Sequence, residues 1–449
     1  MDLDIFAPDY KKEQRALEKA QEMLSRASKL ASDEKDGAVE LYKEALRFID
    51  SKKELMVQHR AGFSDCYLEI GRALKAADQK EESFRSLEAA VEVAPDRAPA
   101  WMELGKALLA EGKFETAAGY LDQALLLAPR EADAWVAKGD AMRSLMEFDE
   151  ARMCYAKALQ LEPLKLEGYD LLLTIAPNDP DVLRGKAVAL SLRGQHEAAQ
   201  DIFKQALSAA PGNPAILTEM GKALARSGHG EEALPFFDRA TQSNPGFKLA
   251  YSAKGRVLAE LGRRDEAVRA HEAALRLDPL DREALSGQAE ALMALGRPAE
   301  ALDFIGRALE LGPRDAELML KNGAALSALG REAEASKSYE DAITIAPEDP
   351  RGWAGKGRAL AAAKNREESL RYFERAAALD PDNSVYAYWK GLALAALGRH
   401  EEAVASYNVA LDHDAESAPA TEARAEALLA LGRLDEAVRV YNRAVVLDP

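Results

Sequence analysis

The chain has 449 residues, of which 48% are hydrophobic and 30% charged, and 76 acidic against 59 basic residues give a formal net charge of −17. This apolar content excludes a wholly disordered chain, because enough surface can be buried to offset the entropy lost on ordering. The acidic balance argues against a general nucleic-acid binder, which needs Lys and Arg to displace counterions from phosphates. We therefore expect a folded protein that does not bind nucleic acid.

Cysteine use and the amino-terminal segment indicate the compartment. Cys66 and Cys154 are too few for a disulfide framework, and no Asn-x-Ser/Thr glycosylation site occurs. Residues 1–6 lack the basic stretch and apolar core of a signal peptide, and no uncharged apolar run reaches the ~20 residues that span a bilayer. We expect a cytoplasmic protein without membrane contact.

A period of 34 residues governs the chain from residue 64 onward. Prolines recur at this interval, apart from one gap of 48 residues and one of 68, at Pro95, Pro129, Pro163, Pro211, Pro245, Pro279, Pro313, Pro347, Pro381 and Pro449. Placing each proline at position 32 of a repeat gives eleven repeats, which begin at residues 64, 98, 132, 180, 214, 248, 282, 316, 350, 384 and 418. A fixed period of this length indicates an array of similar structural units.

The same residue types recur within each repeat. Position 27 is Ala in all eleven repeats, position 8 is Gly or Ala, and apolar residues fill positions 4, 11 and 24, as in Trp101, Leu108 and Leu121. This spacing predicts two amphipathic helices whose small residues allow close approach. Gly at position 15 in most repeats ends the first helix, and the proline ends the second. Each repeat is predicted to be a helix hairpin.

These positions resemble those of a known family. The motif Trp101-x-x-Leu104-Gly105-x-x-Leu108, followed by Ala117-x-x-x-Leu121, Ala124 and Pro129, is similar to the tetratricopeptide repeat. The resemblance implies an all-α, right-handed superhelical solenoid of helix-turn-helix units that binds proteins. The chain departs from the family at Ser83, Ser369, Thr421 and His271, and we interpret His271, which replaces an aromatic residue, as a packing residue.

The period divides the chain into four segments. Residues 1–63 are predicted to form an amino-terminal helical cap with one degenerate repeat, in which Lys53 to Phe63 lengthen the next helix. Three repeats follow over 64–165. Residues 166–179 retain the signal of one helix, with Tyr169 at position 24 of a repeat that has lost its first helix. Eight repeats cover 180–449, and we expect the curvature to change at the interruption.

No catalytic or cofactor motif is visible. No two of the six histidines are spaced i, i+4 to bind a metal from one helix face, and neither a phosphate-binding loop nor a Gly-x-Ser-x-Gly elbow occurs. Gly355-Lys356-Gly357 lies inside a predicted helix and lacks the third glycine of a dinucleotide fingerprint. We expect no enzyme activity, metal or cofactor.

The resemblance implies that positions 2, 5, 9, 12 and 13 of the first helices face a concave groove. These positions carry ten basic and ten acidic residues, with eight basic against four acidic up to Arg256 and the reverse bias beyond it. Apolar groove residues gather near Met102 and near Tyr388. The candidate partner-binding residues are Met102, Lys106, Lys222, Arg226, Arg256, Arg358, Tyr388 and Leu392. The asparagines and lysines of the family's carboxylate clamp are absent from the matching positions.

These features predict a protein-interaction scaffold that holds an extended peptide or a helix of a partner protein in its groove. We expect an acidic or C-terminally charged peptide between Lys106 and Arg256, and an apolar anchor at Tyr388 and Leu392. The alternative is a regulatory or substrate-docking arm of an enzyme whose catalytic domain lies outside these 449 residues. A 35-residue helical array that binds RNA is disfavoured by the acidic charge and the 34-residue period.

The carboxy-terminal helix is predicted from about Asp435 to Leu447, and no helix follows it. Its apolar residues exceed what one hairpin buries, whereas arrays usually end in a polar helix. The sequence leaves two alternatives. Either the natural chain continues past residue 449, or this end pairs with a second copy to form a homo-oligomer.

Overall fold

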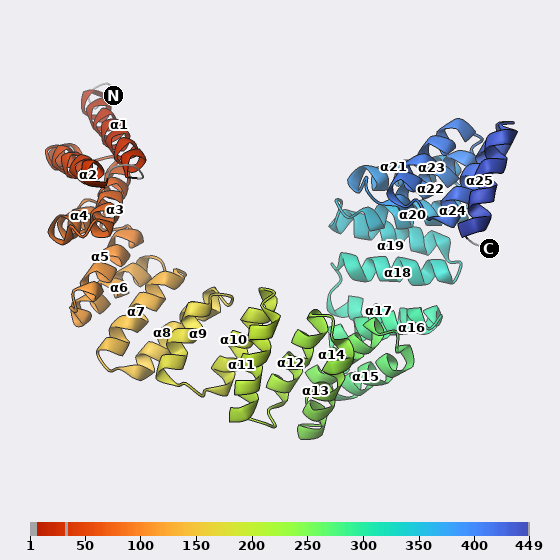
Figure 1. Cartoon of the computed structure of the whole chain (residues 1–449), viewed down its shortest axis with the longest axis horizontal. Helices are drawn as coiled ribbons and strands as arrows, with labels where there is room; N and C mark the ends of the chain where they lie inside the picture. Colours follow the sequence, from red (N-terminus) through yellow and green to blue (C-terminus); the bar gives the residue numbers. More distant parts are fainter. Residues whose placement is uncertain (1–6, 32–34, 448–449) are drawn as a thin grey trace. The chain divides into compact units, whose positions relative to one another are not determined.

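The computed structural model describes residues 7–31 and 35–447, and the regular structure in these ranges is entirely helical (Figure 1). The sequence features at residues 1–6 and at Pro449 lie outside the described residues. None of the described helices is both long enough and apolar enough to cross a bilayer. The prediction of an all-α array of helix-turn-helix units is confirmed.

The chain divides into two compact units, residues 1–211 and residues 212–449. The first unit contains α1 (Ala7–Leu30), α2 (Lys35–Asp50), η1 (Lys53–Leu55), α3 (Arg60–Ala76), α4 (Lys80–Val93), α5 (Ala98–Ala110), α6 (Phe114–Leu127), α7 (Ala132–Ser144), α8 (Phe148–Leu161), α9 (Leu166–Ile175), α10 (Pro180–Leu192) and α11 (His196–Ala209).

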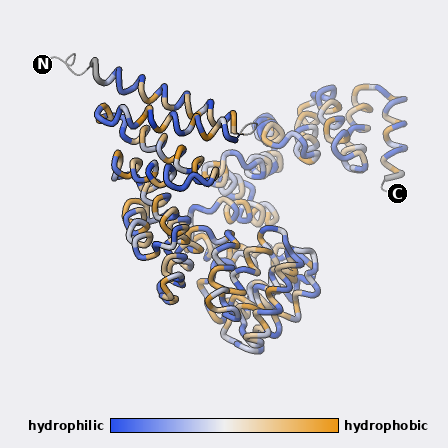
Figure 2. The backbone as a smooth tube through the Cα atoms, turned by 60° about the vertical axis from the view of Figure 1, so that its left-hand side comes forward, coloured by the Kyte–Doolittle hydropathy of each residue, from blue (hydrophilic) through white to orange (hydrophobic). Residues whose placement is uncertain are grey.

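The second unit contains α12 (Pro214–Arg226), α13 (Gly230–Ser243), α14 (Lys248–Glu260), α15 (Arg264–Leu277), α16 (Arg282–Ala294), α17 (Pro298–Leu311), α18 (Ala316–Ala328), α19 (Glu332–Ile345), α20 (Pro350–Ala362), α21 (Arg366–Leu379), α22 (Ser384–Ala396), α23 (His400–His413), α24 (Ala418–Ala430) and α25 (Leu434–Leu447). Apolar and polar residues alternate along these helices, as amphipathic packing requires (Figure 2).

Each hairpin joins a first helix to a second helix, and within each unit a second helix also packs on the first helix that follows it. In the second unit the first helices α12, α14, α16, α18, α20 and α22 also contact one another in sequence. The first helices therefore form one continuous layer. Side chains from neighbouring repeats share this layer, so a surface built on it combines residues 34 positions apart.

Small residues make the close packing feasible. A Cβ atom added to Gly323 in α18 would lie 2.7 Å from the ring of Tyr339 in α19. Gly355 in α20, in the next repeat, abuts the same ring, with an added Cβ atom 2.4 Å away. The aromatic ring at position 24 thus sits between position 8 of its own repeat and position 6 of the next. A larger residue at either glycine would force the ring to shift.

The predicted glycine termination of the first helices is confirmed. Eight glycines at position 15 have φ between +71° and +84°, the left-handed region that favours glycine. Three repeats hold other residues at this position and keep the same conformation, with φ of 60° at Asp78, 67° at Met146 and 65° at Lys364. The turn is therefore fixed by the fold even where the residue type is unfavourable.

The amino-terminal connection differs from the sequence-based expectation. Residues 53–63 do not all lengthen the next helix, because η1 forms over Lys53–Leu55 and α3 begins only at Arg60. The cause is Glu13 in α1, which is 2% exposed and accepts backbone N–H bonds from Val57, Gln58 and His59 at 2.9, 2.9 and 2.7 Å. The buried carboxylate satisfies N–H groups that would otherwise be unpaired at the start of α3.

The single helix α9 lies within the predicted interruption and contacts both α8 and α10. Its Tyr169 ring faces Gly185 of α10, where an added Cβ atom would come within 2.6 Å. An aromatic ring at position 24 of a second helix makes the same contact with position 6 of the next repeat, as Tyr339 does with Gly355.

The last helix, α25, leaves apolar side chains exposed. Its valines Val438 and Val445 are 59% and 63% exposed.

Candidate functional site

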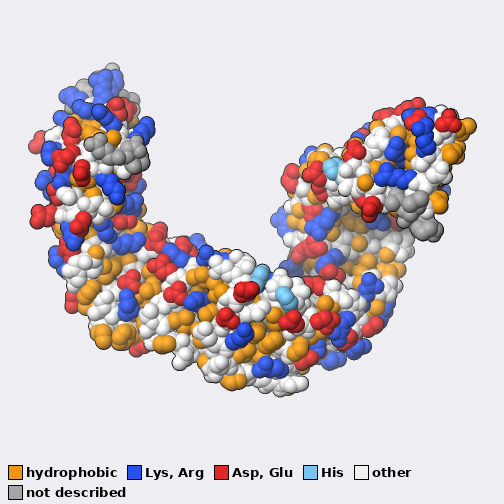
Figure 3. Space-filling view, viewed as in Figure 1, with side chains coloured by type: hydrophobic (Ala, Val, Ile, Leu, Met, Phe, Trp, Pro, Cys, Tyr) orange, Lys and Arg blue, Asp and Glu red, His pale blue; other side chains and the backbone are white. Residues whose placement is uncertain are grey.

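The layer of first helices in the second unit contains two open hollows of about 640 Å³ each. We call one the Trp389 pocket; it lies between α18, α20 and α22, with walls from α19 and α21. We call the other the His271 pocket; it lies between α14, α16 and α18, with a base from α15. Charged side chains of both signs are interspersed over the face visible in Figure 3. Because both signs of charge are spread over this face, the two pockets are distinguished by the residues that line them.

The Trp389 pocket combines small residues, aromatic rings and a basic rim. Its lining residues include Ala324, Ala328, Glu332, Tyr339, Arg358, Ala361, Ala362, Lys364, Arg366, Phe373, Trp389, Leu392, Ala393 and Ala396. The alanines leave space because their side chains end at Cβ. Three basic residues against one acidic residue give this pocket a positive local charge.

Arg358 and Trp389 form one edge of this pocket. The guanidinium carbon of Arg358 lies 5.0 Å from the centre of the Trp389 ring, within the range of a cation–π contact. The indole is held by Phe373 and Tyr386, whose ring centres lie 6.1 and 6.0 Å away. Arg358 is exposed and has no carboxylate partner in the described part of the chain. A positive charge is thus fixed over an aromatic wall.

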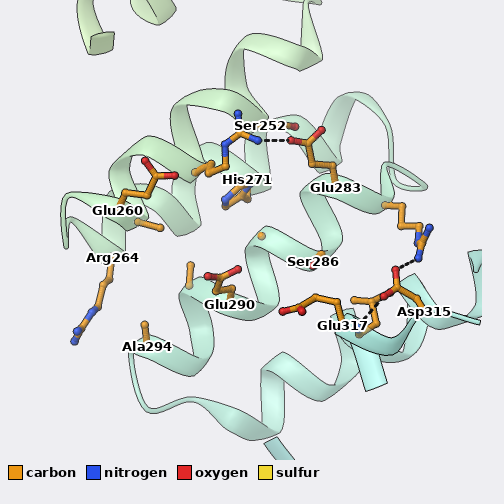
Figure 4. A pocket seen from close by; sticks show the side chains of 16 residues that line it. Ser252, Glu260, Arg264, His271, Glu283, Ser286, Glu290, Ala294, Asp315 and Glu317 are labelled. Atoms are coloured by element: carbon orange, nitrogen blue, oxygen red, sulfur yellow. Dashed lines mark hydrogen bonds and ion pairs between the residues drawn. The ribbon is translucent and has the colours of Figure 1, made fainter. Parts of the chain in front are cut away.

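Most of the residues that line the His271 pocket are polar or charged. It is lined by Ser252, Arg256, Ala259, Glu260, Arg264, His271, Arg282, Glu283, Ser286, Gly287, Glu290, Ala291, Ala294, Asp315, Glu317 and Leu318 (Figure 4). Five carboxylates face three guanidinium groups, so this lining is acidic where the Trp389 pocket is basic. Burial lowers the pKa of His271 to about 4, and the imidazole is therefore neutral at pH 7.

The structure brings some of the sequence-predicted site residues together. Arg358 and Leu392, which is 40% exposed, line the Trp389 pocket. Arg256 lines the His271 pocket and pairs with Glu283 at 3.2 Å. Tyr388 is half-buried and does not line either pocket, because its ring packs on Tyr407 with centres 6.1 Å apart.

The remaining candidates lie elsewhere. Met102 is 9% exposed and packs in the core between α5 and α7, and Lys106 lies 3.9 Å from Asp133 in the same unit. In α12, Lys222 and Arg226 approach the same carboxylate, Glu219, at 2.9 and 3.9 Å. These cations are therefore already accompanied by carboxylates.

Sequence reasoning missed the contribution of the second helices and their turns. Lys364, Arg366 and Phe373 line the Trp389 pocket from the turn after α20 and from α21, although only first-helix positions were expected to matter. His271 on α15 was interpreted as a packing residue and proves also to line a pocket. The signal in the sequence that could have indicated this pocket was the histidine at a position where the family has an aromatic residue.

The described residues hold no group of three or more His, Cys, Asp or Glu arranged to bind a metal ion. Burial raises the pKa of the Cys66 thiol to about 12 and that of the Cys154 thiol to about 11. Both thiols are therefore protonated at pH 7, and a protonated buried thiol is a poor nucleophile.

A family model described as tetratricopeptide repeat matches residues 68–165 and 320–449 in overlapping segments and residues 252–316 in a single one. A second model of the same description matches residues 190–257. These matches cover more than half of the chain. The chain belongs to the tetratricopeptide repeat family. Membership indicates a scaffold for protein–protein interaction, and the family is generally non-catalytic.

Solved structures similar to this chain include YrrB, MamA and the Cut9–Hcn1 hetero-tetramer. YrrB, described as having an unusual peptide-binding site, is 24% identical over 41% of this chain and 95% of its own, with a TM-score of 0.37. MamA is 22% identical over 36% and 95%, with a TM-score of 0.35. The Cut9–Hcn1 hetero-tetramer structure is 14% identical over 93% and 95%, with a TM-score of 0.48. No curated protein sequence matches the chain.

Proposed function

We propose that this tetratricopeptide repeat protein binds an extended acidic segment of a partner protein along the first helices of its second unit. An apolar side chain of that segment enters the Trp389 pocket. The observation that carries the proposal is the Arg358 guanidinium over the Trp389 ring, at the edge of an open hollow with small residues around it.

The pocket has the features of an interface anchor site. Binding energy at interfaces concentrates where an aromatic or aliphatic side chain fills a desolvated pocket, and Trp and Arg are enriched at such sites. Trp389 is held in place by two neighbouring rings, so little side-chain entropy would be lost on binding. Leu392 supplies further apolar surface beside it.

The basic rim defines the charge of the bound segment. Arg358, Lys364 and Arg366 surround the pocket, while Glu332 is its single acidic lining residue. Acidic residues next to the apolar anchor would therefore be attracted. Lys222, Arg226 and Arg256 lie on earlier first helices of the same unit, and we propose that they contribute weaker contacts, since a ligand must compete with their present carboxylate partners.

Selection of random 12-residue peptides displayed on phage against the full chain tests this proposal. We expect the selected peptides to share an apolar residue flanked by Asp or Glu. Arg358→Glu and Trp389→Ala should each weaken their binding at least tenfold, which corresponds to about 1.4 kcal/mol.

Arg307→Glu is the matched control, because Arg307 also lies over an aromatic ring, that of Phe304, at 5.5 Å, but on the second helix α17. This variant should bind as the wild type does. The proposal is wrong if no peptide is enriched, or if the enriched peptides bind Arg358→Glu and wild type equally.

A further inference from the structure

His271 occupies the position 24 slot, which holds an aromatic ring in the preceding repeat (Phe237) and in two later repeats (Tyr339 and Phe373). Added Cβ atoms would lie 2.7 Å from its ring at Gly255 and 2.5 Å at Gly287. This is the same arrangement that surrounds Tyr339 with two glycines. Imidazole is shorter than phenol, so it leaves the outer part of the slot unfilled. The His271 pocket opens at this place (Figure 4).

The polar atoms at the base of this pocket are unsatisfied. His271 is 2% exposed and Ser252 is 3% exposed. Neither ring nitrogen of His271, nor the Ser252 hydroxyl, has a hydrogen-bond partner in the described part of the chain. An unpaired buried polar group destabilises the folded chain, and a ligand that supplies the missing hydrogen bonds removes that penalty. Neutral imidazole and hydroxyl groups both accept hydrogen bonds.

The carboxylates around the base of the pocket differ in whether a cationic side chain pairs with them. Four of the five carboxylates already have cationic partners, in the pairs Glu283–Arg256, Asp315–Arg282, Glu290–Lys321 and Glu317–Arg351. Glu260 has no such partner among the described residues. Figure 4 shows Glu317 extending toward Glu290, whereas the side chain of Arg264 extends away from His271. The interior of the pocket therefore presents hydrogen-bond acceptors and an uncompensated carboxylate.

We infer that the His271 pocket binds a Lys or Arg side chain of the partner segment, with His271, Ser252 and Glu260 as hydrogen-bond acceptors. This inference rests on the proposed function, because the same segment would occupy both pockets. A cation fits better than an anion, since an anion would meet the uncompensated carboxylate of Glu260 and the acceptor groups of the base. It also fits better than an apolar group, which would leave His271 and Ser252 unpaired.

Helix α18 lines both pockets and sets the distance between them. Glu317 and Leu318 near its start face the His271 pocket, and Ala324 to Ala328 near its end face the Trp389 pocket. The two ends of this lining are about 15 Å apart at 1.5 Å per helical residue. An extended peptide covers that span in about five residues. The bound segment should thus carry a basic residue about five positions from its apolar anchor.

The test uses the full chain with ¹³C-labelled histidine and four probes: the N-acetyl amides of arginine, lysine, norleucine and glutamate. The His271 resonance is assigned by its loss in His271→Phe. We expect the arginine or lysine amide to shift that resonance in a saturable manner, and the norleucine and glutamate amides to leave it unmoved. Glu260→Gln should weaken the response at least threefold.

Glu310→Gln is the control, since Glu310 is an exposed acid on α17 outside the pocket, and it should leave the response unchanged. The inference is overturned if neither cationic amide shifts His271, if norleucine amide shifts it equally, or if Glu260→Gln has no effect.

His271→Phe separates the inference from the proposed function. A phenyl ring fits this slot, because Phe373 occupies it in a later repeat beside Gly357. The variant should fold, fill the pocket and weaken the displayed peptides. Peptides that depend on Arg358 but carry no basic residue and ignore His271→Phe would overturn the inference alone. A cationic amide that shifts His271, with no peptide depending on Arg358, would overturn the proposed function alone.

Discussion

The Tyr169 hydroxyl donates a hydrogen bond to the carbonyl oxygen of Pro163 at 3.0 Å. Three tryptophans at position 4 make the same bond to the proline six residues earlier, Trp101 to Pro95, Trp135 to Pro129 and Trp353 to Pro347, at 2.7, 2.9 and 2.9 Å. Tyr169 therefore has the amino-terminal contact of a first helix, although its ring meets Gly185 as a second-helix residue does. One helix serves in both roles where the period is interrupted.

We predict that this double role makes Gly185 sensitive to substitution. Gly185→Ala should destabilise the first unit by ~1–3 kcal/mol, because the new Cβ atom would lie 2.6 Å from the Tyr169 ring. Tyr169→Phe should cost about 1 kcal/mol through loss of the hydrogen bond. Urea unfolding followed by circular dichroism measures both.

Gly119→Ala serves as the control, because Gly119 lies in α6 with no atom within 4 Å of an added Cβ. It should stabilise the protein by about 0.5–1 kcal/mol. Equal effects of the two alanine substitutions would contradict the packing role of Tyr169.

The left-handed turn at Met146 offers a stabilising substitution. Met146 has φ of 67° and is 71% exposed, so its side chain contributes little packing. Met146→Gly should remove a conformational cost of ~1 kcal/mol and raise the melting temperature. Gly262→Ala, at the equivalent turn with φ of 75°, should lower it. A lower melting temperature for Met146→Gly would show that the methionine makes a contact outweighing this cost.

Acid should destabilise the fold through His271. Its pKa is lowered by burial to about 4 in the folded chain, against 6.5 for the unperturbed group, so folding favours the neutral form. The contribution of neutral His271 to the free energy of unfolding is fully present above pH 6.5. It is lost as the pH falls toward 4, and the free energy of unfolding decreases by at most ~1.4 kcal/mol per pH unit.

The His271→Phe variant should lose this dependence. The difference in melting temperature between wild type and variant should therefore widen between pH 6.5 and pH 4.5 and stay constant above pH 7. Parallel curves across the whole range would mean that His271 is not held neutral in the folded protein. Other titrating groups cancel in the difference.

Tyr388 is predicted to stabilise the array. Its ring packs on Tyr407, which is 1% exposed, so Tyr388→Ala would leave a cavity and cost ~2–4 kcal/mol. Binding of the displayed peptides should change little when it is measured well below the melting temperature. A tenfold loss of peptide affinity with the melting temperature unchanged would instead support the anchor role expected from the sequence.

The sequence alone determined the period, the hairpins and their ends. These are local properties, because apolar spacing, a glycine that adopts positive φ and a proline that stops a helix all act within one repeat. These local rules did not predict the backbone structure between Lys53 and Arg60, where η1 forms and α3 begins only at Arg60. There the structure depends on Glu13, about 45 residues earlier, whose carboxylate binds the backbone of three consecutive residues. No local pattern encodes such a contact.

Only the tertiary structure decided which surface residues meet. Arg358 and Leu392 were predicted as site residues, but their pocket also needs Trp389 and, from a second helix, Phe373. At His271 the sequence showed an unusual residue, while the open space and the unpaired nitrogens appear only once Gly255 and Gly287 of adjacent first helices enclose the ring. The physical reason is that a pocket is the space left between repeats. Its shape and charge depend on side chains 34 or more positions apart, whereas a repeat pattern specifies each helix separately.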